Sequence, residues 1–184
     1  KVILPDHLYN HPYLQEFYGT VEWSVRGVFN TYLGWFGGDP SHLHPYSPSQ
    51  YSERLIKLSG GVKNLLNTAE IALEDNDPQW SLQCSQAILR WWNTRNEGDS
   101  KLKLDDLDES IYSNAFQLTI KSLRLLATRE ISANGRNYYL TYARELEGSI
   151  NVKPGPKQVR EVVKQLGAIQ ILKLLPLRLR SERC

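Results

Sequence analysis

Apolar residues recur at helical spacing along most of the chain, and this pattern predicts a series of helices. In the first, expected over residues 21–35, the apolar positions near helical spacing are Val21, Val25, Val28, Phe29 and Tyr32. Gly37-Gly38-Asp39-Pro40 is expected to end it, because this run combines flexible and helix-stopping residues. The same pattern predicts helices over residues 48–58, 62–74, 78–93, 106–130 and 138–146.

Two of these helices are predicted to form an antiparallel hairpin of tetratricopeptide-like appearance. A turn, Asp75-Asn-Asp-Pro78, separates residues 62–74 from residues 78–93. Asp77 is able to cap the second helix, and Pro78 suits its first position. The second helix is expected to pack one stripe into the core, formed by Trp80, Cys84, Ala87, Ile88 and Trp91.

The other segments complete an all-α picture. Asp106 and Glu109 make a capping-box-like start for the long helix 106–130, and its apolar positions on nearly all sides predict burial. Residues 132–135 are expected to interrupt the helical pattern, and residues 1–15 to form an extended arm. No strand-period alternation of any length precedes residue 165, so the predicted fold class is all-α, a multi-helix bundle.

Composition narrows the class of protein. The chain has 184 residues, of which 41% are hydrophobic and 10% aromatic, so it is able to bury a core. It contains no Met and opens on Lys1, which leads us to expect a fragment or a trimmed chain. Cys84 and Cys184 are too few for a disulfide framework, and Cys84 is expected to be a small buried hydrophobe. No apolar stretch approaches the roughly 18 residues that a membrane span needs, and the compartment stays open.

Charge is distributed unevenly. Residues 153–184 carry eight Lys and Arg against two Glu, a net +6, so the rest of the chain carries −4 to give the total of +2. A basic helix is expected over residues 157–166. Such asymmetry is compatible with nucleic-acid binding. Because the basic residues alternate with Leu and Ile, a solvated helix face or a domain contact is the preferred interpretation, and no nucleic-acid partner is expected.

The four histidines do not form a metal motif. The run His42-Leu-His44 supplies the H-x-H that opens the metallo-β-lactamase motif H-x-H-x-D-H, but Tyr46 and Ser47 stand where Asp and His are needed. His7 and His11 have the i,i+4 spacing of a helical zinc pair. Prolines on either side of them argue against a continuous helix. We therefore expect no metal site in this sequence.

Other catalytic patterns are missing as well. The sequence has no G-x-S-x-G and no Cys close to a His. Its paired glycines are too short to form a phosphate-binding loop, and its acidic pairs stand at a helix start, where capping explains them. The residues alone therefore predict a helical domain without a catalytic site of its own.

Three longer runs, taken in order, resemble one family. The first extends from Tyr18 to Pro40, with Tyr32-Leu-Gly-Trp-Phe-Gly-Gly-Asp-Pro40 at its end and Leu43-His-Pro45 after it. The second is Gly60-Gly61 leading into the hairpin, and the third is Asn134-Gly-Arg-Asn-Tyr-Tyr-Leu-Thr-Tyr-Ala-Arg-Glu-Leu146. Together they are similar to the helical dimerisation domain of the alkyl-sulfatase family of metallo-β-lactamase-fold hydrolases. The resemblance covers residues 15–148 or thereabouts.

This resemblance implies a domain order: a zinc domain, then the dimerisation domain, then a sterol-carrier-like domain. Residues 16–150 would be the dimerisation domain, and residues 151–184 a linker and the start of the third domain. The parent enzyme would use two zinc ions to generate a hydroxide and hydrolyse an alkyl sulfate ester. The segment itself would form a homodimer and frame the active site beside an upstream metallo-β-lactamase domain, without being catalytic alone.

The sequence departs from the family pattern where a His is common near the sulfate pocket. Trp23 stands there, and its indole only donates a hydrogen bond, whereas imidazole also exchanges a proton. In the third run, Gly135 replaces the usual Trp and Tyr142 a small residue. The candidates for lining a substrate pocket are Trp23, Arg26 and Tyr32. The alternative is that these three side chains serve helix packing and the surface.

A second class of function remains open. The helical hairpin would also suit a stand-alone adaptor that binds a protein or peptide. Only one convincing hairpin is seen in the sequence, whereas such arrays need about three or more repeats to be stable. The dimerisation segment is therefore the preferred hypothesis.

Overall fold

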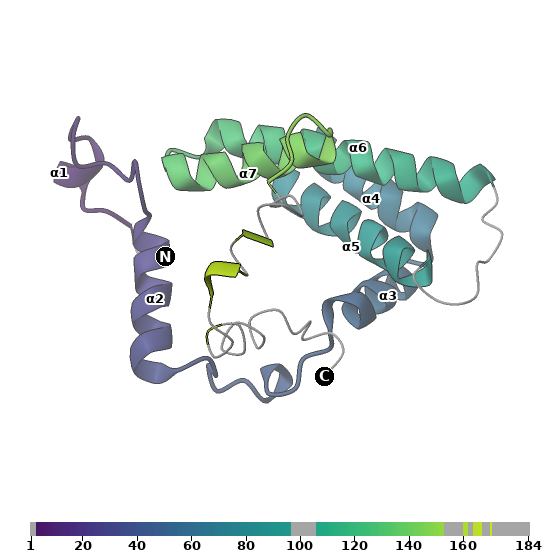
Figure 1. Ribbon diagram of the computed structural model, residues 1–184, viewed down its shortest axis with the longest axis horizontal. Coiled ribbons are helices and arrows are strands. Elements are labelled where there is room, and N and C mark those ends of the chain that lie inside the picture. The colour runs from purple at the N-terminus through teal and green to yellow at the C-terminus, as the bar shows by residue number, and fades with distance from the viewer. Residues whose placement is uncertain (1–2, 97–105, 153–159, 162–163, 167–169, 171–184) are drawn as a thin grey trace. The chain divides into compact units, whose positions relative to one another are not determined.

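The computed structural model describes residues 3–96, 106–152, 160–161, 164–166 and 170, and the regular structure within them is entirely helical. The predicted all-α class is confirmed. The elements are α1 (Asp6–Tyr9), α2 (Val21–Leu33), the 3-10 turn η1 (Pro40–His42), α3 (Pro48–Leu58), α4 (Val62–Glu74), α5 (Pro78–Asn96), α6 (Asp106–Arg129) and α7 (Ala133–Leu146), as Figure 1 shows. The chain divides into two compact units, residues 1–143 and 144–184.

Local chemistry explains where α3 begins. The Ser47 hydroxyl accepts a hydrogen bond of 3.3 Å from the Gln50 backbone N–H, and the Gln50 side chain accepts one of 3.1 Å from the Ser47 N–H. Pro48 occupies the first helical position, where its missing N–H costs nothing. This reciprocal capping box fixes the start of the helix.

Turns that need positive φ separate α3, α4 and α5. Gly60 and Gly61 adopt φ values of 84° and 125°, which side chains with a Cβ rarely take. After α4, the Asp77 carboxylate accepts a hydrogen bond of 3.0 Å from the Trp80 N–H, so the predicted cap of α5 is confirmed. The short turn makes α4 and α5 neighbours; the tetratricopeptide-like character of this hairpin stays a prediction.

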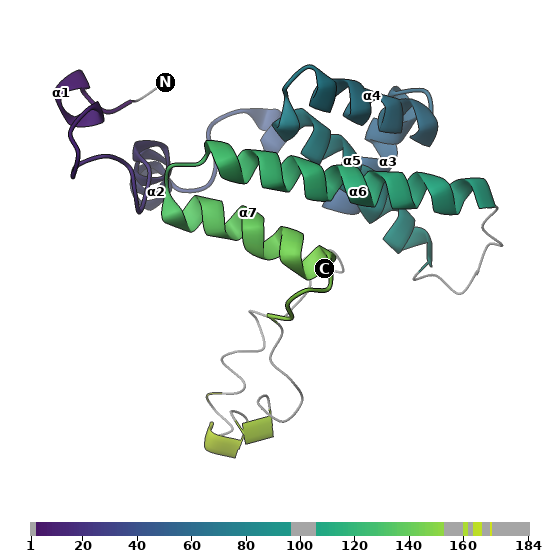
Figure 2. The ribbon, with the colours of Figure 1, turned by 90° about the horizontal axis from the view of Figure 1, so that it is seen from above.

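Helix α5 lies at the centre of the bundle, packed against α3, α4 and α6, while α6 also packs against α4 (Figure 1). The core that these helices share contains Ile56, Leu65, Leu66, Ala69, Cys84, Ala87, Ile88, Leu89, Ile111, Ala115 and Leu118. Each large aliphatic side chain buried in this way stabilises the fold by about 1.5–3 kcal/mol. Cys84 is fully buried, as predicted. Figure 2 shows α7 running beside α6 on the same side of the bundle.

The tryptophans of α5 differ from the predicted stripe. Trp92 is buried and lies against the ring of Tyr112 on α6, with centroids 5.1 Å apart. Trp80 is 39% exposed and Trp91 only half-buried, so their assignment to the core stripe was wrong in part. Because α6 packs on the face that carries Cys84 and its i+8 neighbour, Trp92 is the aromatic residue that becomes buried.

The predicted break between the two helices is present, but it lies at residues 130–132 and not at 132–135. Helix α6 ends at Arg129, and α7 begins at Ala133 and includes Gly135. The Ser132 hydroxyl accepts a hydrogen bond of 3.3 Å from the Gly135 N–H, so serine caps the helix. This cap stabilises the first turn of α7 although that turn contains a glycine. Two smaller differences are the helical turn α1 inside the expected arm and the extension of α5 to Asn96.

Several expectations fall outside the described residues. They concern the side chain of Asp106, most of the basic helix over residues 157–166, and Cys184. Within the second unit, the chain leaves α7 through Gly148, whose φ is 71° and which closes the helix as predicted. Ser149 N–H donates there to the Arg144 carbonyl at 3.0 Å. Among the described residues, no helix combines the length and apolar character needed to cross a membrane.

Candidate functional site

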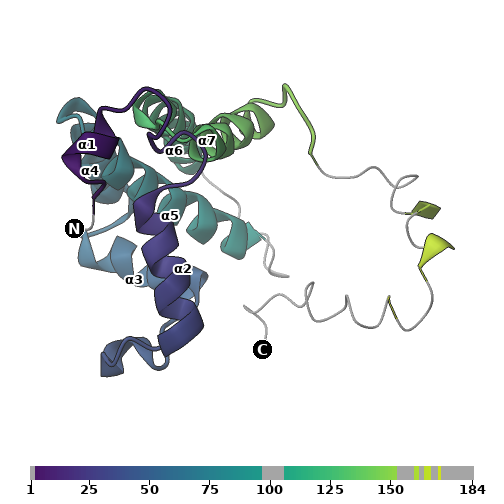
Figure 3. The same ribbon diagram turned by 90° about the vertical axis from the view of Figure 1, so that its left-hand side faces the viewer.

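Helix α2 is exposed all along its length, although it is rich in apolar residues. None of its thirteen residues is buried. Val28 is 58% exposed, Tyr32 81% and Leu33 69%. Figure 3 views the molecule from the side on which α2 lies in front of the bundle helices. A helix with an apolar face normally buries that face against another element. This makes α2 the candidate functional element of the chain.

Its own start is well defined by local bonds. Thr20 has extended backbone angles, and its hydroxyl accepts a hydrogen bond of 3.2 Å from the Trp23 N–H. The Glu16 carboxylate accepts from the Val21 N–H, which satisfies a second free donor of the first turn. At the other end, Gly34 at φ 80° stops the helix two residues before the predicted end at Trp35. Helix α2 is therefore specified locally.

The two sides of α2 differ in character. At about 100° per residue, five apolar positions share one face, which we call the α2 stripe: Val21, Val25, Val28, Phe29 and Tyr32. The opposite side carries Trp23, Gly27 and Asn30, with Arg26 at its edge. The first three positions of the stripe also line a groove of about 490 Å³ together with Leu4 and Leu14 of the preceding segment.

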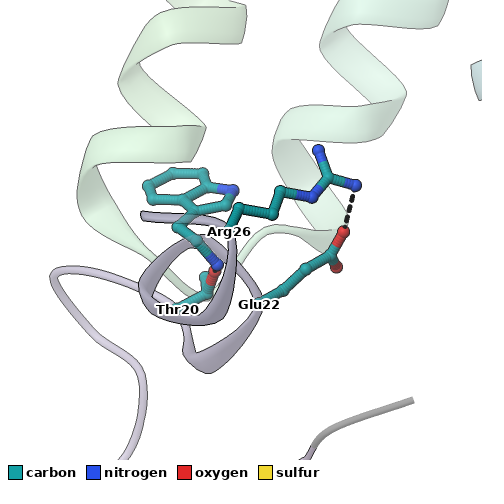
Figure 4. Close-up of polar contacts among 4 residues, drawn as sticks. Thr20, Glu22 and Arg26 are labelled. Atoms are coloured by element: carbon teal, nitrogen blue, oxygen red, sulfur yellow. Dashed lines mark hydrogen bonds and ion pairs between the residues drawn. The ribbon is translucent and has the colours of Figure 1, made fainter. Parts of the chain in front are cut away.

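The structure places the three predicted pocket residues on α2 but not on one face. Trp23 and Arg26 are three residues apart and neighbours on the helix surface. Tyr32 lies about two and a half turns beyond Trp23, which puts it on the opposite side and within the α2 stripe. Arg26 donates to the Glu22 carboxylate at 2.6 Å (Figure 4), and both side chains are exposed. Their role in a substrate pocket stays a prediction.

Helix α2 is joined to the bundle at its beginning. The Ser132 hydroxyl donates a hydrogen bond of 2.6 Å to the Tyr18 carbonyl, and the Ala133 N–H donates one of 2.7 Å to the Phe17 carbonyl. These bonds attach the segment before α2 to the first turn of α7. The attachment fixes where α2 leaves the bundle.

The connection from α2 to α3 is anchored by charge. The Asp39 carboxylate accepts hydrogen bonds from the Ser41 N–H at 2.9 Å and the Ser41 hydroxyl at 2.8 Å, and caps η1. These bonds lower the pKa of Asp39 below its usual value. Further along, the Arg54 guanidinium lies 3.7 Å from the centre of the Tyr46 ring, which ties the connection to α3.

A second surface feature lies on the bundle itself, between α3, α5 and α7. A groove of about 540 Å³ has walls of partly exposed aromatic rings, Tyr51, Trp80, Tyr138 and Tyr142, and a floor that includes the buried Ala87 and Leu123. We call it the aromatic groove. The Gln86 amide donates to the Tyr142 hydroxyl across it at 3.3 Å. Its residues come from four helices, α3, α5, α6 and α7, so their convergence could not be read from the sequence.

His7 lies in the short helix α1, and His11 follows that helix. Helix α1 ends at Tyr9, so His7 and His11 do not share a continuous helix. His11 accepts from the Tyr13 N–H through Nδ1 at 3.2 Å. In the described part of the chain, no three His, Cys, Asp or Glu side chains are grouped so that they could hold a metal ion. The described residues therefore offer no group of ligands that fits a zinc ion.

Comparison with known proteins identifies the family to which this helical segment belongs. The family model described as alkyl sulfatase dimerisation matches residues 1–149. A linear primary-alkylsulfatase of a Pseudomonas species is 37% identical over 180 residues, which are 97% of this chain and 31% of that protein. An (R)-specific secondary-alkylsulfatase, also from Pseudomonas, is 25% identical and is aligned over 80% of this chain and 20% of its own length. The chain thus spans a third or less of these relatives.

Solved structures show the same fold. The stereoselective inverting sec-alkylsulfatase Pisa1 from Pseudomonas matches with a TM-score of 0.64 and 25% identity, over 83% of this chain and 21% of that one. A double mutant of PisA1 matches with a TM-score of 0.71 and 23% identity, over 100% of this chain and 26% of that one. Nothing in these matches favours the stand-alone adaptor. The chain belongs to the alkyl sulfatase dimerisation family, and corresponds to a segment of larger alkylsulfatase chains.

Proposed function

We propose that this chain pairs with a second copy of itself through α2, as the dimerisation segment of an alkylsulfatase. The observation that carries the proposal is the exposure of the α2 stripe. Val25, Val28 and Phe29 are each at least 40% exposed although they follow one another along a single helical face. The membership of the family supports a second copy as the surface that covers them.

Energetics also favour a covered α2. An isolated helix shorter than about 12–15 residues is marginal in water, and α2 has 13 residues. Removing a large apolar side chain from water stabilises by about 1.5–3 kcal/mol. Covering the stripe would therefore stabilise α2 by several kcal/mol. This matters because the hydrogen bonds that attach α2 to the bundle lie near its first residues.

The other side of α2 is proposed to frame the active site of the enzyme. Trp23 offers an indole N–H and Arg26 a guanidinium, both donors suited to an anionic group such as a sulfate ester. Glu22 holds the guanidinium at 2.6 Å and orients it along the helix surface. Alkyl sulfate is proposed as the substrate because the relatives are named alkylsulfatases.

The metallo-β-lactamase fold and the two zinc ions implied by the resemblance belong to this proposal too. The described residues offer no fitting ligand group, so the metal would be bound by other residues of the enzyme. This chain's residues would then contribute binding and positioning. Their test in the intact enzyme is Trp23→Phe and Arg26→Gln, which should raise KM for an alkyl sulfate more than they lower kcat. Unchanged KM in both variants would reject the framing role.

Sedimentation equilibrium tests the pairing. The wild-type chain should have the mass of a dimer, and Val25→Glu combined with Phe29→Glu should shift it to the monomer, because charge would face the second copy. The control variant Asn30→Glu carries a new charge on the opposite side of the same helix and should remain a dimer. A wild-type monomer at every concentration would reject the proposal.

A further inference from the structure

We infer that the α2 stripe of each chain lies in the aromatic groove of the other, so that two copies exchange their arms. The arm here means residues 16–34, α2 with its capping segments. This inference rests on the proposed function, since it names the surface on which the second copy receives α2. It assigns a use to a groove that neither the family match nor the fold explains.

The aromatic groove has the chemistry of a helix-binding surface. The groove is lined by Tyr51 from α3 and by Tyr138 and Tyr142 from α7. Tyr138 is 80% exposed and Trp80 39% in the single chain. Tyrosine and tryptophan dominate the energetics of interfaces when they become covered. An amphipathic helix that lays its apolar face into such a groove is a common mode of recognition.

The groove and the arm complement each other in kind. The stripe presents Val25, Val28 and Phe29, which are compact and carry no charge, to a groove whose floor is apolar at Ala87 and Leu123. Hydrogen-bonding groups of the groove, such as Gln83, lie among its walls and are available to the polar flanks of a helix. The groove also carries Arg90, an exposed residue whose long side chain is able to keep its charge in water when the two surfaces meet.

The arm leaves the bundle close enough to the aromatic groove for its length to span the distance to a partner's groove. The arm leaves the bundle beside Ser132 and Ala133, and Tyr138 and Tyr142 lie 5–9 residues further along α7, about 8–14 Å away at 1.5 Å per residue. Helix α2 itself is about 20 Å long. Two chains related by a twofold axis near the start of α7 would each have an arm long enough to reach the other's groove.

Symmetry supports a second copy as the occupant. Each chain carries one arm and one groove, so a reciprocal exchange in a twofold dimer satisfies both surfaces on both chains. A peptide in the groove would leave the stripe uncovered, and another domain of the enzyme would have to cover the stripe and the groove separately. A pairing of α2 against α2 would leave the aromatic groove uncovered.

Mixing of two variants tests the exchange in the full chain. The arm variant is Val25→Glu with Phe29→Glu, and the groove variant is Tyr51→Lys with Tyr138→Lys. Both tyrosines are exposed, so a folded monomer should tolerate their replacement. Each variant alone should dimerise at least about 100-fold more weakly, a loss expected for interface aromatics. Leu58→Lys with Ile71→Lys, exposed residues outside the groove, is the matched control and should dimerise as the wild type does.

An equimolar mixture of the arm and groove variants should regain a heterodimer, because one intact arm meets one intact groove. Dimerisation of the groove variant at the wild-type strength, or a mixture that stays monomeric, would overturn the inference while leaving the proposed pairing in place. A wild-type chain that is itself monomeric would remove both.

Disulfide trapping gives a second reading that does not depend on weakened variants. In chains carrying Cys184→Ser, Val28→Cys is mixed with a chain carrying Gln83→Cys and oxidised. A crosslinked dimer should form, while Val28→Cys mixed with Leu58→Cys should give none. Equal crosslinking in the two mixtures would contradict the arm exchange, and a peptide or other domain in the groove would prevent crosslinking in both.

Discussion

The hydroxyl of Ser132 donates a hydrogen bond of 2.6 Å to the carbonyl oxygen of Tyr18, a residue 114 positions earlier in the chain. The same hydroxyl accepts from the Gly135 N–H at 3.3 Å and caps α7. Ser132 is fully buried, and its own N–H donates to the Glu130 carboxylate at 3.0 Å. One side chain therefore starts a helix and fixes the arm that carries α2.

Replacing Ser132 with Ala should lower the free energy of unfolding by about 1–2 kcal/mol, because both a cap and a long-range hydrogen bond are lost. Urea unfolding followed by circular dichroism measures it. The control Ser24→Ala removes a hydroxyl that donates to the Thr20 carbonyl within the arm, and should change stability by about 0.5 kcal/mol or less. Equal effects of the two substitutions would contradict the assigned role of Ser132.

The two tryptophans Trp80 and Trp92 should respond differently to truncation. Trp92→Ala should cost about 3–5 kcal/mol, since it empties a buried site beside Tyr112. Trp80→Ala should cost much less in a monomer because the ring is partly exposed. Denaturation of both variants at a concentration where the chain is monomeric decides this. A larger loss for Trp80 would place the core elsewhere.

Burial raises the pKa of the Cys84 thiol to about 11, and Asp77 adds to the shift. The thiol is therefore protonated in the folded chain at neutral pH and should resist alkylation until the chain unfolds. Labelling of the Cys184→Ser chain at pH 8, with and without denaturant, measures this. Rapid labelling of the folded chain would contradict the burial.

The same shift predicts a pH dependence. The ordinary thiol pKa of 9.0 applies to the unfolded chain and about 11 to the folded one. Because the pKa of the thiol is higher in the folded chain, the thiol's contribution to folding stability is fully present below pH 9. That contribution is lost as the pH rises towards 11. Stability of the wild-type chain should therefore fall more steeply than that of Cys84→Ala between these values. Parallel curves for the two chains would contradict it.

Buried hydroxyls between α5 and α6 offer a further comparison. Thr119 Oγ1 lies 2.9 Å from Ser85 Oγ and 2.9 Å from the Ala115 carbonyl, whereas the Ser122 hydroxyl has no partner among the described residues. Ser122→Ala should therefore leave stability unchanged or raise it, since it removes an unsatisfied buried group. Thr119→Val should cost about 1 kcal/mol. Thermal unfolding of both variants tests the difference, and a greater loss for Ser122→Ala would reveal a partner for its hydroxyl.

Sequence predicted the helices wherever their ends carry local signals. Asp77 and Pro78 start α5, and the glycine pair Gly60-Gly61 separates α3 from α4, as expected. The start of α7 was missed because Gly135 counts as a helix breaker when its neighbours are unknown. In the structure, the Ser132 cap holds it, and a contact with the distant Tyr18 helps to orient that cap.

The candidate site was predictable only in part. The spacing of Val21, Val25 and Val28 already marks one apolar face of α2. Whether that face is buried depends on packing, which a single sequence does not contain. The aromatic groove depends on α3, α5 and α7 coming together, so Tyr51 and Tyr142 gave no signal in the sequence. Trp23 and Tyr32 were grouped by their residue types, although the helix separates them.

Amide hydrogen exchange measured at increasing protein concentration tests most directly whether a second copy covers α2. The amides of residues 21–33 should become more protected as the concentration rises through the dimerisation range, because cover of the stripe follows mass action. Those in the buried centre of α5 should exchange at the same slow rate throughout. Protection of α2 that does not change with concentration would contradict the claim that a second copy covers this helix.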